Sequence, residues 1–204
     1  MHVSVPRVGL FASFALACSL AILATPQAMA MSGSPARMQS EMRKLWEDHL
    51  TYSRNYVISG LAGIKDTGLV AARLMENQSA IGQTLRGAYG SQVGDRFASL
   101  LKNHILIAFD IVDAAHGGDV NGITAGQNQW HTNAEEIADL LSSLNPRWKR
   151  PMILSTLYRH LDHMAAQIAA RMAQNWAADI DAYDQDHDEM LAFADLLATG
   201  ISHP

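Results

Sequence analysis

The chain has 204 residues, of which 49% are hydrophobic and 17% charged, and its formal net charge is −5 at pH 7. This acidic balance, without a basic cluster, argues against nucleic acid or an anionic lipid surface as the partner, because both require a basic face. The length suits one domain with a sizeable core.

Residues 1–30 have the order of features of a signal peptide. Arg7 is followed by an apolar run from Val8 to Ala24, and then by Ala28-Met29-Ala30, which is typical of a signal-peptidase site. The run falls just short of the roughly 20 residues needed to span a membrane, so we predict cleavage rather than a stable membrane anchor. The mature protein is expected to begin near Met31 and to be exported, as a periplasmic or secreted protein.

Cleavage would also remove the only cysteine, Cys18. Residues 1–30 hold one arginine and no acidic residue, so the mature chain, residues 31–204, has a net charge of −6. It can form no disulfide, no thiolate metal site and no cysteine nucleophile. Any chemistry must therefore use histidine, carboxylate, hydroxyl or amide groups.

The rest of the chain is predicted to be helical. Residues 31–37 are small and polar and are expected to form a flexible leader, followed by a single domain over residues 38–204. From residue 36 onward the apolar residues recur with a helical period, and alternation typical of strands is almost absent. We predict six helices, at about residues 36–60, 68–88, 92–116, 122–143, 150–174 and 177–201. Because the connections are short, the expected fold is an all-α, up-and-down antiparallel bundle of four to six helices.

Most of the expected helix boundaries have local causes, such as Gly117-Gly118-Asp119 before the fourth helix and Asn145-Pro146 after it. The join near Asn175 has no helix breaker, so the last two helices could form one kinked rod. We identify no internal repeat in the sequence.

Four of the expected helices carry a histidine on the apolar stripe, at His49, His104, His160 and His187. Each lies near the middle of its helix, roughly three turns beyond the expected start. In antiparallel rods these positions have similar heights, so we predict that the four imidazoles converge on one buried site. The alternative is that a neighbouring side chain or carbonyl satisfies each histidine separately.

An imidazole-rich site without thiolates suits a transition metal such as zinc, copper or iron. Met164 and Met190, each within one turn of a histidine, also leave room for haem ligation. Asp179 is kept as a supporting acid, because a carboxylate commonly holds the outer nitrogen of a ligand histidine. The acids expected instead to form a solvated face are Asp181, Asp184, Asp186 and Asp188.

Two other functions remain open. One is a non-catalytic bundle that binds a small polar ligand or a protein partner, with aromatic residues such as Trp46 and Trp130 lining its cavity. The other is an enzyme with a histidine acid or base, for which Ser53 or Ser155 could be proposed as nucleophile only by position. The di-iron Glu-x-x-His pairs, His-Glu-x-x-His, nucleotide-binding glycine motifs and Gly-x-Ser-x-Gly are all missing.

Several spaced motifs run along the chain, including Leu45-Trp46-x-x-His49, Trp130-x-x-Asn133-Ala134, Asn145-Pro146-x-Trp148 and Asp179-x-x-x-Tyr183-x-x-x-His187. With these motifs the mature chain resembles, over nearly all of its length, a family of exported bacterial helical proteins without an established function. Some members carry enzyme names, glycosyltransferase among them, that nothing in these residues supports. The resemblance therefore implies a helical fold and export, and no mechanism.

Overall fold

The computed structural model describes residues 34–203, which are helical apart from short connections. The helices are α1 (Pro35–Ala62), α2 (Thr67–Tyr89), α3 (Ser91–Gly117), α4 (Val120–Leu144), α5 (Arg150–Met172) and α6 (Trp176–Ser202). No strand occurs in this range, so the all-α prediction is confirmed, and every predicted helix end lies within two residues of the observed one. None of these six helices combines the length and the hydropathy needed to cross a membrane.

The predicted signal peptide lies outside the described residues. The predicted flexible leader lies partly inside them, and its last three residues, Pro35 to Arg37, belong to α1. Ser34 caps this helix, since its side chain accepts a hydrogen bond from the backbone nitrogen of Arg37 at 3.3 Å. Pro35 suits the first helical position because its missing N–H would have no partner there.

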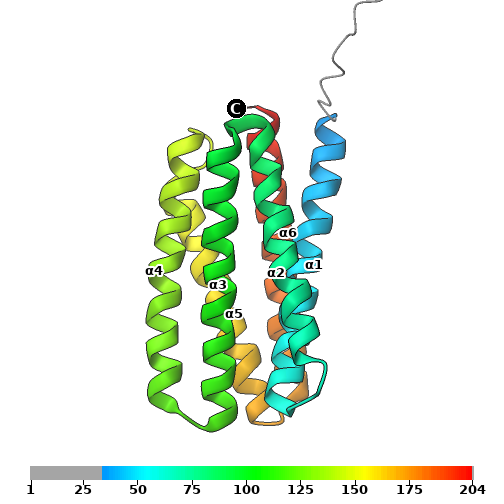
Figure 1. Ribbon diagram of the computed structural model, residues 1–204, viewed down its shortest axis with the longest axis vertical. Helices are drawn as coiled ribbons and strands as arrows, with labels where there is room; N and C mark the ends of the chain where they lie inside the picture. Colours follow the sequence, from blue (N-terminus) through cyan, green and yellow to red (C-terminus); the bar gives the residue numbers. More distant parts are fainter. Residues whose placement is uncertain (1–33, 204) are drawn as a thin grey trace, which may run out of the picture. The chain divides into compact units, whose positions relative to one another are not determined.

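The six helices form a ring of antiparallel neighbours. Each helix packs against the next one along the chain, and α6 closes the ring by packing against α1 (Figure 1). The odd-numbered helices, which run in the same direction, also contact one another across the middle of the bundle. Residues on the inner faces of α1, α3 and α5 therefore meet although they are far apart in the sequence.

The helical path is interrupted between α5 and α6, so the kinked-rod alternative is wrong. Gln174 adopts a left-handed conformation with a φ of 56°, and the side chain of Asn175 accepts a hydrogen bond from the backbone nitrogen of Ala178 at 3.2 Å. Asparagine is a strong N-cap residue, and this cap starts a new helix without a proline or glycine.

The structure also reveals a repeat that residue identities hide. In α1, α3 and α5 the histidine and the residues at the same five spacings from it are buried. They are Met42, Trp46, His49, Leu50, Ser53 and Val57; Phe97, Leu101, His104, Ile105, Ala108 and Val112; and Ile153, Leu157, His160, Leu161, Met164 and Ile168. In α2, α4 and α6 buried positions recur at one constant interval along the sequence, as in Leu74, Trp130 and Asp186, and in Leu85, Leu141 and Leu197. The domain is therefore built from three helical hairpins, α1–α2, α3–α4 and α5–α6.

The first two hairpins each contain an equivalent hydrogen bond between their two helices. Asn77 Nδ2 donates to the carbonyl oxygen of Leu45 at 3.0 Å, and Asn133 Nδ2 donates to that of Leu100 at 3.1 Å. In both hairpins the accepting carbonyl lies one turn before the buried histidine. The repeat thus gives each hairpin one inward histidine at the same height.

Candidate functional site

Three of the four histidines singled out from the sequence meet in the middle of the bundle. His49, His104 and His160 are each no more than 4% exposed. The ring centroid of His160 lies 5.7 Å from that of His49 and 5.7 Å from that of His104. The three occupy the equivalent positions of the three hairpins, which explains why they have the same height.

Each ring is held through Nδ1 by a side chain of the following helix. The atoms at hydrogen-bond distance are Gln78 Nε2, 3.2 Å from His49 Nδ1; Asn133 Oδ1, 2.9 Å from His104 Nδ1; and Asp186 Oδ1, 2.7 Å from His160 Nδ1. We refer to these three histidines and their three partners as the histidine centre. All the hydrogen bonds found at these imidazoles use Nδ1, which leaves Nε2 for another partner.

The partners set the tautomers of two rings. The oxygens of Asn133 and Asp186 accept, so Nδ1 of His104 and of His160 carries the hydrogen. A neutral imidazole that donates from Nδ1 has its lone pair on Nε2, which is the form that binds metals.

His49 is held less firmly. The amide nitrogen of Gln78 also approaches the carbonyl oxygen of Leu74 at 3.0 Å and Asn77 Oδ1 at 3.1 Å. An amide nitrogen has two hydrogens, and here three acceptors compete for them.

Burial keeps two of the rings neutral. Removal from water, together with the neighbouring His160, lowers the pKa of His104 to about 3, although the hydrogen bond with Asn133 opposes this change. Burial, followed by His160 and His104, also holds the pKa of His49 well below its ordinary value. At neutral pH both imidazoles are therefore neutral and carry one hydrogen each. That of His104 lies on Nδ1, whereas His49, whose Nδ1 accepts from Gln78 Nε2, carries its hydrogen on Nε2.

Three buried polar atoms at or beside the centre have no hydrogen-bond partner within residues 34–203. They are Trp46 Nε1, Gln78 Oε1 and Asp186 Oδ2. The Trp46 ring packs edge-on against His49 with centroids 5.3 Å apart, so this donor also belongs to the surroundings of the centre. Buried polar atoms in native proteins are nearly always satisfied, so these three are exceptions gathered around one centre.

The position of Asp186 corrects the sequence interpretation, which placed it on a solvated acidic face. An apolar stripe of α6 that includes His187 also includes Trp176 and Ile180 at helical spacing, yet these two residues are 52% and 51% exposed. The buried side of the first half of α6 carries Asp179, Ala182 and Asp186. Because two of its inward residues are acidic, a stripe chosen by hydrophobicity was rotated by about one residue. The constant interval that leads from Leu74 to Trp130 and on to Asp186 was the signal that could have identified this carboxylate.

His187 is the histidine that the structure places elsewhere, so its predicted convergence with the others is wrong. Its side chain is 27% exposed, and its Nε2 lies 2.8 Å from Glu47 Oε2. Partial burial would lower the pKa of His187, but the bonds with Glu47 and Asp188 outweigh it and raise the pKa. The residue therefore belongs to a surface ion pair.

Asp179 is buried as expected, but it supports no histidine. Its carboxylate accepts hydrogen bonds from Arg54 at 2.9 and 2.8 Å and from Arg171 at 2.7 Å. It lies two turns before Asp186, or roughly 10 Å along the helix axis. The two guanidinium groups satisfy this carboxylate and make it part of the packing between α1, α5 and α6.

Within residues 34–203 no group of three or more histidine, cysteine, aspartate or glutamate side chains is already arranged to hold a metal ion. Ser155 accepts a hydrogen bond from Arg159 at 2.8 Å, and no serine is hydrogen-bonded to a histidine in this part of the chain. The nucleophile suggested at Ser155 therefore gains no support from a neighbouring base.

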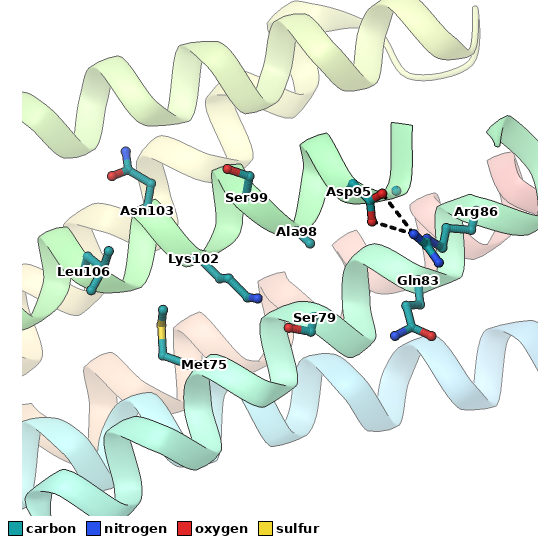
Figure 2. Close-up of a pocket in the computed structure, with 11 residues that line it drawn as sticks. Met75, Ser79, Gln83, Arg86, Asp95, Ala98, Ser99, Lys102, Asn103 and Leu106 are labelled. Carbon is teal, nitrogen blue, oxygen red and sulfur yellow. Dashed lines mark hydrogen bonds and ion pairs between the residues drawn. The ribbon is translucent and has the colours of Figure 1, made fainter. Parts of the chain in front are cut away.

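Surface cavities lie between neighbouring helices. One of about 590 Å³ lies between α2 and α3, where the polar chains of Ser79, Ser99 and Lys102 line it and the ion pair of Arg86 and Asp95 crosses one end (Figure 2). Another, of about 240 Å³, lies between α3 and α4 and includes Asn133 among its lining residues. The second cavity thus reaches a partner of the histidine centre from outside.

Comparison of the chain with protein-family models, curated proteins and solved structures finds no match.

Proposed function

We propose that this is an exported protein that binds a transition-metal ion, such as zinc, copper or iron, at the histidine centre. The observation that carries the proposal is the arrangement of three neighbouring buried imidazoles, each held through Nδ1 by a side chain of the next helix. Metal-binding histidines donate the outer N–H to such a partner, as His104 and His160 do, which fixes the ring and leaves the Nε2 lone pair for the metal. His49 accepts at Nδ1, so it could bind through Nε2 only after its hydrogen moves to Nδ1 and Gln78 presents Oε1 to it.

The second ring nitrogens support an ion at this place, because the hydrogen bonds of the three imidazoles within residues 34–203 account only for Nδ1. A cation bound by Nε2 would satisfy the second nitrogen. For all three rings to share one ion they must move closer than they stand here, and the loosely held His49 has the most freedom to turn.

A single ion fits the centre better than haem does. The ring of His160 neighbours those of His49 and His104, and His104 also stacks on Trp130 with centroids 5.5 Å apart. Trp46 closes the other side against His49. A macrocycle would have to separate these rings, whereas an ion needs only side-chain rotations.

A small polar ligand is the second candidate, favoured by the unpartnered atoms Trp46 Nε1, Gln78 Oε1 and Asp186 Oδ2. Such a ligand would be bound without catalysis. Protein that carries a stoichiometric organic compound and no metal when purified from its host would favour this function over metal binding.

The test is elemental analysis and metal titration of the mature protein. We expect one zinc or cobalt ion per chain, and a strong loss of affinity in the variants His104→Asn and His160→Asn. His187→Asn is the matched control, because this histidine has the same chemistry but lies in a surface ion pair. An unaltered protein that takes up no ion, or a loss of affinity equal in the control, would contradict the proposal.

Thermal unfolding provides an independent readout of the same binding. A ligand at 100 times its dissociation constant stabilises the folded state by about 2.7 kcal/mol. For a domain of this size that corresponds to a rise in Tm of roughly 5–10 °C. The rise should be absent in His104→Asn and complete in His187→Asn.

A further inference from the structure

Asp186 is a buried carboxyl group whose hydrogen-bond partner within residues 34–203 is an imidazole and not a guanidinium or ammonium group. Its side chain has no exposed surface. Oδ1 lies 2.7 Å from His160 Nδ1, while Oδ2 has no hydrogen-bond partner in the described part of the chain. Asp179, the other buried acid of α6, instead contacts two arginines. In proteins a buried carboxylate is paired with a cation or coordinates a metal, because burying an isolated charge costs much free energy.

The repeat shows that the fold does not require a carboxylate at this place. The equivalent positions in the first and second hairpins hold Leu74 and Trp130, both buried. The partners of His49 and His104 are amides, so only the third hairpin brings a charge to the centre. The packing of the repeat does not explain why an acid stands at this position, so we relate Asp186 to the proposed ion.

We infer that Asp186 is the positioning residue of the proposed ion site, which holds His160 with its Nε2 lone pair toward the ion and places a negative charge next to the ligand of a divalent cation. This inference rests on the proposed function. A carboxylate on the outer nitrogen makes a ligand histidine more basic and fixes its orientation. Imidazole ligands supported by a carboxylate suit Zn²⁺ and Co²⁺, whereas Cu⁺ prefers soft thiolate and thioether ligands, so the two divalent ions should bind in preference to Cu⁺.

The decisive variant is Asp186→Asn, which keeps an acceptor oxygen for His160 and removes the charge. We expect the dissociation constants for Zn²⁺ and Co²⁺ to rise roughly 10- to 100-fold, the range found for lost outer partners of metal ligands. The absorption bands of bound Co²⁺ should persist, because Asp186 holds a ligand and is not one itself. Asp184→Asn, an exposed acid on the same helix, is the control and should bind as the unaltered protein does.

The outcomes separate this inference from the proposed function. If the unaltered protein binds no metal, the proposed function fails and this inference with it. If the unaltered protein binds metal and a folded Asp186→Asn variant binds equally well, only the role of Asp186 is overturned. Should that variant not fold, Asp186→Leu allows the same comparison, since leucine occupies the equivalent buried position at Leu74. A Tm reduced without any change in affinity would mark Asp186 as purely structural.

Discussion

The imidazole of His104 lies against that of His160, with ring centroids 5.7 Å apart and planes inclined by 21°. The two residues come from equivalent positions of the second and third hairpins, and Asn133 and Asp186 hold them from the next helices. These outer partners account for Nδ1 of each ring, and within residues 34–203 no hydrogen bond is formed at either Nε2.

The rings should act as a unit in binding. We expect His104→Ala and His160→Ala each to weaken Zn²⁺ binding strongly, and the double variant to lose less binding free energy than the sum of the two single losses. Competition titration with a chromophoric chelator on folded protein measures the three affinities. Pairing His104→Ala with His187→Ala should give an additive result, because His187 lies outside the centre. Additive losses for His104 and His160 would show that they do not share an ion.

The metal-free protein should lose stability in acid. The folded-state pKa of His104 is lowered from 6.5 to about 3, so the unfolded chain binds more protons between these values. The stability contribution of the neutral ring is therefore complete above about pH 6.5 and is lost progressively as the pH falls toward 3. At pH 4.5 the loss from His104 alone is roughly 3 kcal/mol, since each pH unit corresponds to about 1.4 kcal/mol. Urea unfolding against pH measures it, and His104→Leu should flatten this part of the profile.

Asp179 should matter for stability and not for metal. Asp179→Asn removes the charge that Arg54 and Arg171 share in a largely buried position. We expect it to lower the free energy of unfolding by about 3 kcal/mol, because two guanidinium groups lose their counter-charge. Metal affinity of the folded variant should stay unchanged, and chemical unfolding with a parallel metal titration checks both. A lowered affinity would restore the supporting role expected from the sequence.

Two glycines of α2 provide a matched pair for the contact between α2 and α3. A Cβ at Gly82 would lie 2.5 Å from the Cβ of Ala98 and 2.7 Å from the carbonyl oxygen of Gly94, whereas a Cβ at Gly87 would meet nothing within 4 Å. Gly82→Ala should destabilise the protein by about 1–3 kcal/mol through overpacking. Gly87→Ala should be neutral or stabilise by up to about 1 kcal/mol, since alanine is the better helix former. Thermal unfolding of both variants decides, and equal effects would contradict the close helix contact.

Export can be tested at the chain terminus. The charged start, apolar run and Ala28-Met29-Ala30 predict cleavage by signal peptidase. Mass spectrometry of protein from the periplasm or medium should therefore find a mature chain that begins at or near Met31. Recovery of the intact chain from the cytoplasm alone would refute this prediction.

The helices could be read from the sequence because their causes are local. The helical period of apolar residues and the caps act over a few positions, so each predicted helix end lies within two residues of the observed one. The common height of His49, His104 and His160 could be predicted for the same reason, since it follows from the number of residues between each helix start and its histidine. The break at Asn175 was also local, but its N-cap was overlooked.

The orientation of α6 depended on partners that lie far away in the sequence. Hydrophobicity alone favours turning Trp176 and Ile180 inward and Asp186 outward, and the structure does the reverse. Asp186 is buried next to His160, 26 residues earlier, which lies at hydrogen-bond distance from it. His187 lies outside the core, where it contacts Glu47, 140 residues away. The sequence by itself determined the helices and the histidines that could converge, while tertiary packing decided which acid joins them, because the pairing that offsets the burial of a charge exists only once the helices meet.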